Sequence, residues 1–208
     1  MIQAADPPLV LASASAARRA VLEAAGLRLA ALAAAVDEAA IKESARSEGL
    51  PPQEAALVLA DAKARRIMPK APEALVIGAD QILVCPQEDG SLRWFDKPAD
   101  LAAARAQLLA LRGRAHRLVT AVVCWRHGER IWQHVAQPQL VMRDFSEAFL
   151  DAYLAMEGER VLSSVGAYRL EGPGVQLFRE VQGEHSAILG LPLLPLLGFL
   201  RDHGVLTR

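Results

Sequence analysis

The chain has 208 residues, of which 52% are hydrophobic and 5% aromatic, and its formal charge is −1 at pH 7. This composition predicts a globular protein with a single domain over residues 1–208, and excludes disordered and fibrous classes. The near-neutral charge excludes a global field that attracts nucleic acid or an acidic membrane, so we expect neither as a partner. An anionic substrate must then be held by a few locally placed cations.

The chain also lacks the sequence signals of a membrane or secreted protein. Its apolar runs are broken by Gly, Pro or charge well short of the roughly 20 residues that cross a bilayer. The stretch Leu9–Ala17 has no basic segment before it and is a poor signal peptide. Cys85 and Cys124 lie in apolar runs without ligand spacing, which favours buried free thiols over a disulfide or a metal site. We therefore expect a cytoplasmic protein.

In chain order, strand patterns alternate with helix patterns. We expect strands at Leu9–Ala12, Leu27–Val36, Leu75–Cys85, Leu92–Phe95 and Val175–Val181, and a hairpin formed by His116–Trp125 and Ile131–Met142. We expect helices over Ala16–Ala25, Gln53–Met68, 101–111, 147–156 and Leu191–His203. Such alternation, together with the hairpins, predicts the α/β class with a mixed, twisted sheet and flanking helices.

Asp80 carries the sharpest signal for chemistry. It lies in the strand Leu75–Cys85, whose two faces are otherwise largely apolar. An ionised carboxylate in such a place is costly unless a cation or a metal pairs with it. Gly78, on the same strand, permits the close approach of a ligand or of another backbone. We interpret Asp80 as a catalytic or metal-binding residue, with a structural salt bridge as the alternative.

The junction between the first strand and the first helix is suited to a phosphate. A helix N-terminus offers unpaired N–H groups and a positive dipole end. Ser13 and Ser15 can cap this helix or donate to a phosphate oxygen. Arg18 lies on the inward stripe of the helix and is the better phosphate ligand, whereas Arg19 is expected to pair with a glutamate four residues later. The alternative is a surface arginine beside an ordinary serine cap.

Three further positions are weaker candidates. Lys63 lies on a small apolar helix stripe, from which it either extends to solvent or points into a cleft with an anion. Lys97 lies between a strand end and a helix cap, a typical ligand-facing edge. Glu38 forms an acidic pair with Asp37, although a helix-cap role for Asp37 explains that residue equally well.

Two other features are less informative. His116 starts a strand, where a lone histidine is more often structural than functional. Tyr168, Arg169 and Glu171 lie in a loop bracketed by glycines, which is a candidate recognition loop. No Walker-type loop, zinc-ligand spacing or serine-hydrolase elbow is found.

Taken in order, these residues resemble the Maf family of nucleoside triphosphate pyrophosphatases. The resemblance runs from about Leu9 to the C-terminal helix, which is almost the whole chain. The matching segments are Leu11-Ala12-Ser13-Ala14-Ser15-Ala16-Ala17-Arg18, Asp37-Glu38, Lys63-Ala64, Gly78-Ala79-Asp80, Lys97-Pro98, His116 to Thr120, Gly166-Ala167-Tyr168 and Gly190-Leu191-Pro192-Leu193. Any one of these motifs is weak, but their order and compatible spacing make the series specific.

The resemblance implies an α/β fold with two lobes around a deep cleft, of the inosine triphosphatase type and often a homodimer. It implies hydrolysis of a nucleoside triphosphate to the monophosphate and pyrophosphate with Mg or Mn. Asp80 would be the general base or a metal-bound carboxylate, and Glu38 would help to place the metal. The residues implied to hold the triphosphate are Ser13, Ser15, Arg18, Lys63 and Lys97.

Three positions bear on the base of the nucleotide. A family branch that acts on thymidine and uridine triphosphates carries Arg, Thr and Gln there, and a branch that acts on 7-methyl-GTP carries Trp, Gln and Glu. This chain has Ala17, Gln81 and Glu171, so two of the three positions favour the 7-methyl-GTP branch. Ala17 departs from both patterns and removes a stacking surface worth about 1–3 kcal/mol by analogy with aromatic–base stacking.

Two other functions stay open at this point. One is a regulator of septum formation that binds nucleotide or nucleic acid without turnover, for which the departures from the family pattern at Ala16, Ala17 and Ala187 leave room. The other is a pyrophosphatase for dTTP and UTP or for inosine triphosphate, against which Gln81 and Glu171 argue. The retained charges at the candidate site favour an enzyme.

Overall fold

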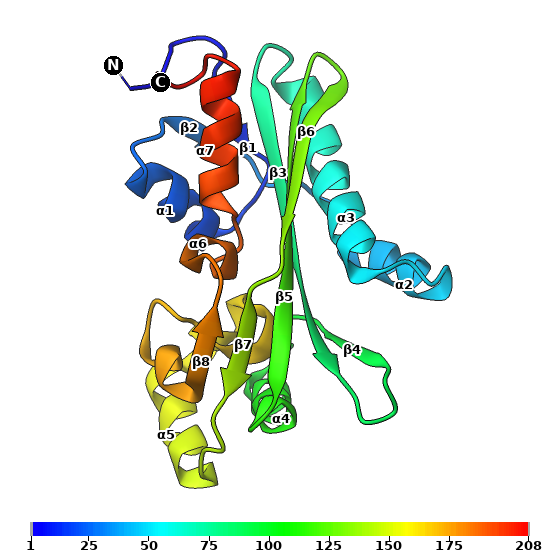
Figure 1. Cartoon of the computed structure of the whole chain (residues 1–208), viewed down its shortest axis with the longest axis vertical. Coiled ribbons are helices and arrows are strands. Elements are labelled where there is room, and N and C mark those ends of the chain that lie inside the picture. Colours follow the sequence, from blue (N-terminus) through cyan, green and yellow to red (C-terminus); the bar gives the residue numbers. More distant parts are fainter. Residues whose placement is uncertain (1, 208) are drawn as a thin grey trace. The chain divides into compact units, whose positions relative to one another are not determined.

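The computed structural model describes residues 2–207 and contains helices around a mixed eight-stranded sheet (Figure 1). The strands are β1 (Leu9–Leu11), β2 (Leu29–Ala31), β3 (Leu75–Pro86), β4 (Leu92–Phe95), β5 (Ala115–Arg126), β6 (Glu129–Ala136), β7 (Gln139–Met142) and β8 (Phe178–Gln182). The α-helices are α1 (Ala16–Ala24), α2 (Glu38–Ser47), α3 (Pro52–Ile67), α4 (Leu101–Leu111), α5 (Glu147–Glu157), α6 (His185–Ile188) and α7 (Leu193–Asp202). The predicted α/β class with a mixed sheet is confirmed.

The sheet has the strand order β2-β1-β3-β5-β7-β8, with β4 paired to β3 and β6 paired to β5. β1 runs parallel to β2 and β3, whereas β4 to β8 form antiparallel pairs. By its contacts the chain divides into two compact units, which β3 and β5 both enter. The first unit comprises the described chain up to Asp80, Thr120–Ala136 and the described chain from His185, and the second comprises Gln81–Val119 and Gln137–Glu184. A single domain, a cleft between lobes and a homodimer stay predictions.

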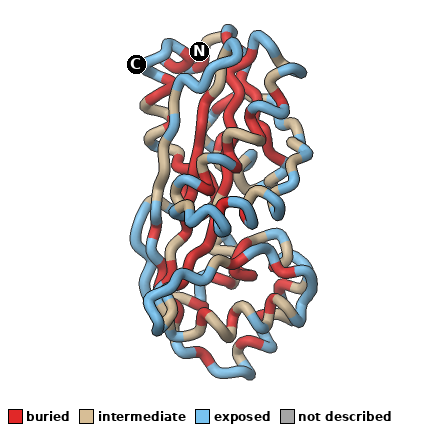
Figure 2. Tube along the Cα trace, turned by 90° about the vertical axis from the view of Figure 1, so that its right-hand side faces the viewer, coloured by how far each residue is buried: buried red, intermediate tan, exposed pale blue. Residues whose placement is uncertain are grey.

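In the first unit, helices cover both faces of β3. Leu75, Ile77 and Ala79 alternate along one face and belong to a core cluster with residues of α1 and α7. Gly78 faces the other side, against α3. Because side chains two residues apart on a strand lie on the same face, Asp80 shares the face that α3 covers. Figure 2 shows how the buried positions gather along the strands.

Gly78 sets the close packing of α3 on β3. A Cβ built at Gly78 would lie 2.3 Å from the carbonyl oxygen of Ala60 and 2.9 Å from the Cβ of Ala64. Both alanines are fully buried, as is Ala56 on the same stripe. The close backbone approach predicted at Gly78 is confirmed, and its partner is the backbone of α3.

The predicted hairpin is confirmed, with an interruption in its second limb, whereas two other strand predictions were wrong in their extent. The second limb of the predicted hairpin is two strands, β6 and β7, because Pro138 lacks the N–H that would continue the ladder. β8 starts only at Phe178, since Pro173–Leu177 forms a 3₁₀ helix. The strand predicted over Leu27–Val36 is confined to β2.

Helix α2 was not predicted. Its sequence consists mostly of polar residues and alanines, with Ile41 as its only large apolar residue, so the apolar pattern did not indicate it. Asp37 caps it, with its Oδ1 accepting from the N–H of Ala40 at 3.0 Å. The cap role considered for Asp37 is confirmed, and Glu38 becomes the first residue of the helix.

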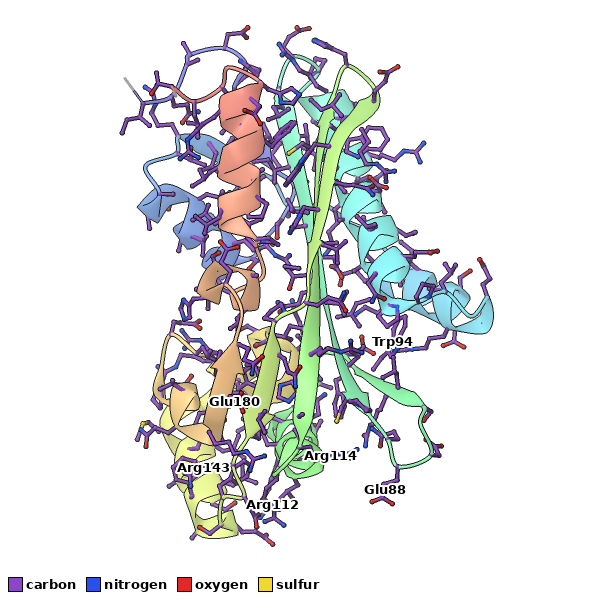
Figure 3. All side chains as sticks on the ribbon, viewed as in Figure 1. Glu88, Trp94, Arg112, Arg114, Arg143 and Glu180 are labelled. Carbon is purple, nitrogen blue, oxygen red and sulfur yellow. The ribbon has the colours of Figure 1, made fainter. Side chains whose placement is uncertain are left out.

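In the second unit, several cations serve the fold. Arg112 and Arg143 donate to the main-chain carbonyls of Phe145 and Gln176 at 3.4 and 2.6 Å, and Arg114 donates to that of Pro86 (Figure 3). These arginines therefore link the chain next to α4, β5 and β7 to main-chain carbonyls of other segments, including the end of β3.

Two expectations about burial and membranes can be compared with the structure. Cys85 and Cys124 are free and buried, as predicted. Among residues 2–207, the helices lack the combined length and apolar character that a bilayer crossing demands.

Candidate functional site

The centre of the candidate site is an ion-paired cluster in the first unit. The Nζ of Lys63, on α3, lies 2.5 Å from Oδ1 of Asp80 on β3 and 2.7 Å from Oε1 of Glu38 on α2. Asp80 and Lys63 are 3% and 7% exposed, whereas Glu38 reaches solvent. Of the two directions considered for Lys63, it takes the inward one toward an anion. The cation that a buried Asp80 requires is therefore Lys63.

Asp80 keeps one oxygen for further chemistry. Its Oδ2 is buried and receives no hydrogen bond from any residue of the described chain. A buried acceptor without a partner is uncommon in native proteins and indicates a missing ion, water or reactant. The carboxylate is thus held at Oδ1 by Lys63 and is available at Oδ2.

The second part of the site is the turn from β1 into α1. The main-chain N–H of Ala12 donates to the carbonyl of Ile77 at 2.8 Å, which ties this turn to β3 just before Asp80. Ser15 is the N-cap of α1 and accepts from the N–H of Arg18 at 3.3 Å. The predicted cap role is confirmed for Ser15. The N-terminal end of α1 is therefore capped, and it carries the positive end of the helix dipole.

Arg18 is held in place by two contacts. Its Nε donates to the carbonyl of Gly190 at 2.8 Å, and its Nη1 donates to Oγ of Ser13 at 3.3 Å. Burial lowers the pKa of the guanidinium from its ordinary value, while the carboxylates of Asp80 and Glu38 raise it. The field of the acidic pair therefore reaches Arg18, so the cation and the pair belong to one electrostatic site.

Arg19 behaves differently from Arg18. Its Nε lies 2.6 Å from Oε1 of Glu23, and both side chains are exposed, as the spacing predicts. Next to it, the turn encloses a hollow of about 300 Å³, which is lined by Ser13, Ala14, Ser15, Ala16, Arg19, Ala31 and Ala33. Small side chains and hydroxyl groups thus leave space directly at the N-terminal end of α1.

The donor set around Asp80 fits a Mg²⁺ or Mn²⁺ ion. Both ions prefer oxygen ligands, and Mg²⁺ is usually bound by one or two carboxylates together with substrate phosphates. Asp80 offers an unpartnered oxygen, and Glu38 approaches the same Lys63 from the solvent side. Within residues 2–207, His, Cys, Asp and Glu side chains form no group of three that could hold a metal. The fit is therefore to an ion shared with a phosphate, not to a cage made of protein ligands alone.

The predicted base-reading residues lie in the second unit, except Ala17 on α1. Gln81 follows Asp80 on β3. Lys97, which was predicted to hold the triphosphate, is an exposed residue of the segment after β4 and also lies in the second unit. Glu171 pairs with Arg169, with Oε1 to Nε at 3.1 Å. Arg169 also pairs through Nη1 with the buried carboxylate of Glu157 at 3.2 Å. The recognition loop is thus anchored through Arg169, and the roles of Gln81, Lys97 and Glu171 stay predictions.

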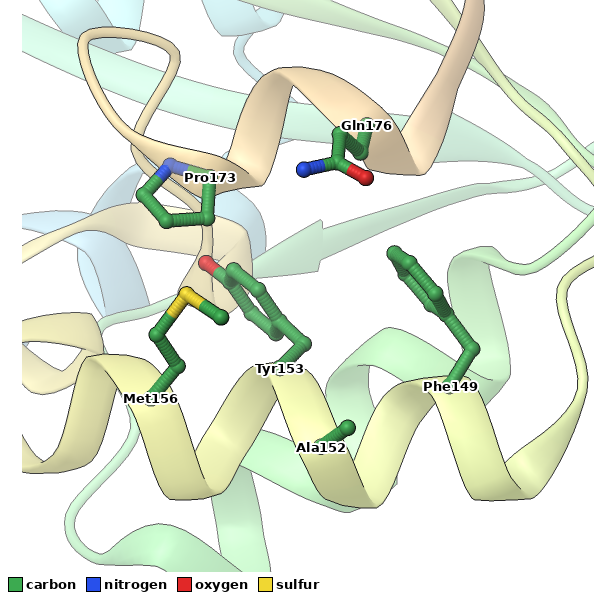
Figure 4. Close-up of a pocket in the computed structure, with 6 residues that line it drawn as sticks. All are labelled: Phe149, Ala152, Tyr153, Met156, Pro173 and Gln176. Carbon is green, nitrogen blue, oxygen red and sulfur yellow. The ribbon is translucent and has the colours of Figure 1, made fainter.

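The second unit has a hollow of its own, with a different lining. It has a volume of about 80 Å³ and is lined by Phe149, Ala152, Tyr153, Met156, Pro173 and Gln176 (Figure 4). The Tyr153 hydroxyl donates to the carbonyl of Ala167 at 3.2 Å, and burial raises its pKa above the ordinary value. With no carboxylate, lysine or arginine in its lining, this hollow is unsuited to a polyphosphate.

Comparisons with known proteins bear on this geometry. A protein of Granulibacter bethesdensis called "Nucleoside triphosphate pyrophosphatase" is 57% identical over 96% of this chain and 98% of its own. A "7-methyl-GTP pyrophosphatase" of Rhizobium etli is 46% identical over 96% of this chain and 98% of its own. A solved structure titled nucleoside-triphosphatase or dITP/XTP pyrophosphatase, from Mycobacterium abscessus, covers 95% of both chains with a TM-score of 0.42 and 16% identity, a likeness too distant to carry an argument.

The sequence profile described as "Maf-like protein" matches residues 8–203. The chain belongs to the Maf family. The resemblance inferred from the motifs is therefore confirmed. Of the predicted Maf site residues, the structure brings together Ser13 with Arg18, and Lys63 with Glu38 and Asp80.

Sequence reasoning missed the residue that positions Arg18 in this Maf protein. Gly190 has a φ of +100°, and a Cβ there would lie 3.0 Å from Nε of Arg18. The motif Gly190-Leu191-Pro192-Leu193 contained this residue, but a distance of 172 positions separates it from Arg18. Glu157 was also missed, since a glutamate near a helix end gives no sign that tertiary packing buries it.

His116 yields a pH prediction for the second unit of the Maf chain. It is 1% exposed, its Nε2 lies 2.9 Å from Oη of Tyr168, and burial lowers its pKa from 6.5 to about 4. Above pH 6.5 the histidine is neutral in both the folded and the unfolded protein. Between pH 6.5 and about 4 the unfolded protein binds a proton there and the folded protein does not. The free energy of unfolding should therefore fall by about 3 kcal/mol between pH 6.5 and pH 4 through this residue alone.

The measurement is denaturant unfolding of wild type and His116→Gln across this pH range. Carboxylates also titrate there, so the difference between the two proteins isolates the histidine. Parallel pH profiles for the two proteins would contradict the prediction.

Proposed function

We propose that this Maf protein hydrolyses a nucleoside triphosphate to the nucleoside monophosphate and pyrophosphate. The observation that carries the proposal is the buried Asp80 carboxylate, which is paired on one oxygen with Lys63 and unpartnered on the other. It lies in one electrostatic site with Arg18 and Glu38. Relatives with the name "Nucleoside triphosphate pyrophosphatase", 57% and 53% identical to this chain, support it.

The residues divide the work by their chemistry. We assign Ser13, Arg18 and the N-terminal end of α1 to the phosphates, because they combine hydrogen-bond donors, a cation and a positive dipole end. Preorganised cations of this kind stabilise the charge that spreads over a transferring phosphoryl group, which is most of what such a reaction needs.

Asp80 is assigned to the attacking water. Its Oδ2 is a buried acceptor without a partner in the described chain, so it can take the proton of a water that attacks the α-phosphate. Asp80 and Glu38 are the residues that would hold a Mg²⁺ or Mn²⁺ ion. When bound there, such an ion would polarise a phosphoryl oxygen and lower the pKa of a water molecule.

The substrate that we propose is a modified purine triphosphate such as 7-methyl-GTP. Gln81 and Glu171 follow the pattern of the corresponding branch, and relatives 44–46% identical are named "7-methyl-GTP pyrophosphatase". Glu171 pairs with Arg169, which is itself anchored to the buried Glu157, so the loop presents a positioned carboxylate. Buried thiols at Cys85 and Cys124 suit a reducing compartment, so we place the reaction in the cytoplasm.

The decisive experiment is a pyrophosphate-release panel with canonical, methylated and deaminated triphosphates, each with Mg²⁺ and with Mn²⁺. We expect metal-dependent release, fastest with 7-methyl-GTP. No release with any triphosphate would favour the non-catalytic regulator of septum formation. A preference for inosine triphosphate, or for dTTP and UTP, would keep the reaction and replace the substrate.

Glu171→Gln tests the base preference. Removing the charge that pairs with a cationic methylated guanine should lower the ratio of kcat/KM for 7-methyl-GTP to that for UTP by about tenfold, with a smaller change in the maximal rate. The measurement is kcat/KM for both nucleotides. Glu159→Gln, at an exposed glutamate of the same unit, is the control and should leave the ratio unchanged. An equal loss for every base would show that Glu171 does not read the base.

A further inference from the structure

We propose that Lys63 occupies the cation position between Asp80 and Glu38 as long as no nucleotide is bound, and that a metal ion gains this pair only when a triphosphate draws the lysine away. The inference rests on the proposed function and adds a binding order to it. Its basis is that one ammonium contacts both carboxylates, at 2.5 and 2.7 Å. These two are the carboxylates that the site offers to a metal.

The lysine cannot leave without a replacement. The side chains of Lys63 and Asp80 are 8% and 4% exposed, so water solvates neither charge well. Separating a buried pair leaves an uncompensated charge, which is strongly destabilising. The Glu38 side chain is 42% exposed and forms the open side of the cluster. A cation or a phosphate can therefore approach the cluster from the side of Glu38.

With the lysine in place, the cluster is a poor metal site. The ammonium already offsets one of the two carboxylate charges. An incoming divalent ion would meet a positive charge within contact distance of the same oxygens, where repulsion is strong because solvent screening is weak. Metal and Lys63 are therefore competitors for Asp80 and Glu38.

A triphosphate reverses this balance. Its oxygens are strong acceptors for an ammonium group, so Lys63 can exchange Asp80 for a phosphate without becoming unpaired. Both carboxylates would then lose their contact with the ammonium, and the phosphate oxygens would supply ligands of the kind that Mg²⁺ prefers. Metal and triphosphate should therefore strengthen each other's binding by the same factor.

The test is Mn²⁺ binding to the substrate-free full chain, followed by the paramagnetic resonance signal of free Mn²⁺. Lys63→Met keeps the length of the side chain and removes its charge. It should bind Mn²⁺ on the order of tenfold more tightly than wild type. In wild type, a non-hydrolysable α,β-methylene triphosphate should tighten Mn²⁺ binding by a similar factor, after correction for Mn²⁺ held by the free analogue, and Lys63→Met should lose most of this gain.

Two controls locate the effect. Lys70→Met removes an exposed lysine of the same unit and should leave Mn²⁺ affinity at the wild-type value. When Asp80→Asn is added to Lys63→Met, the double variant should lose the tighter Mn²⁺ binding of Lys63→Met. If the tighter binding persists, the ion lies elsewhere and the inference is wrong. An unchanged or weaker affinity in Lys63→Met overturns it as well.

Should Lys63→Met fail to fold, Lys63→Gln supplies a second variant, because it keeps a hydrogen-bond donor toward Asp80 without the charge. The nucleotide-dependent tightening in wild type needs no variant, and its absence would also reject the binding order. Failure of the proposed function has a different signature, since it would appear as a lack of pyrophosphate release in the panel. Release together with uncoupled Mn²⁺ binding would reject the binding order alone.

Discussion

Asp80→Asn is expected to lower the turnover of pyrophosphate release by at least about a hundredfold while the fold is retained. Asparagine has nearly the same shape but cannot take a proton from a water molecule and attracts a cation only weakly. Lys63 would keep its contact with Glu38, so the ammonium would not be left without a negative partner. The loss should therefore appear in kcat, with a circular dichroism spectrum like that of wild type.

Asp61→Asn is a matched control for this experiment. Asp61 is also an ion-paired aspartate of the first unit, where it accepts from Nε1 of Trp125 at 2.7 Å and pairs with Arg130. It takes no part in the cluster around Lys63, so turnover should stay at the wild-type value. Wild-type turnover in Asp80→Asn would remove Asp80 from the mechanism and with it the proposed reaction.

Gly78→Ala should lower the free energy of unfolding by about 3 kcal/mol, a large effect for one methyl group. The new Cβ would lie 2.3 Å from the carbonyl oxygen of Ala60. This oxygen belongs to the main chain, which cannot relieve the clash by changing a rotamer as a side chain can. Helix α3 would have to move away from β3 and would carry Lys63 with it. We therefore expect a loss of turnover as well as a lower melting temperature.

Gly198→Ala is the control for Gly78→Ala. Gly198 lies inside helix α7, and a Cβ there would meet nothing within 4 Å apart from the nearby backbone of α7 itself. Alanine is the better helix former, so this change should be neutral or stabilise the protein by up to about 1 kcal/mol. Thermal and denaturant unfolding of both variants give the comparison. Equal stability of the two would contradict the close packing of α3 on β3.

The sequence predicted the central features of the fold because they depend on local patterns. The strand containing Asp80 is a continuous apolar run, and the helix starting at Pro52 has a proline at its first position, so their bounds fall within a few residues of the prediction. Where tertiary context decides, prediction was poorer. The strand predicted over Leu27–Val36 is limited to β2, the three residues that pair with β1, and that pairing cannot be read from an apolar run.

The same division holds for the candidate site. Burial of Asp80 in an apolar strand requires a cation, but spacing alone did not identify Lys63 as that cation. The two residues are 17 positions apart, and only the packing of α3 against Gly78 brings them together. The anchoring of Arg18 by Gly190 depends in the same way on a contact between distant parts of the sequence.

The hydrogen bonds of Ser13 have a consequence for the kind of ligand that its hydroxyl can meet. Its Oγ already accepts from the N–H of Ser15 at 3.2 Å and from Nη1 of Arg18 at 3.3 Å. A hydroxyl has two lone pairs and one proton, so only its donor capacity is left. Toward a ligand, Ser13 can therefore only donate a hydrogen bond. It favours an anionic oxygen and cannot accept from an amine or another donor.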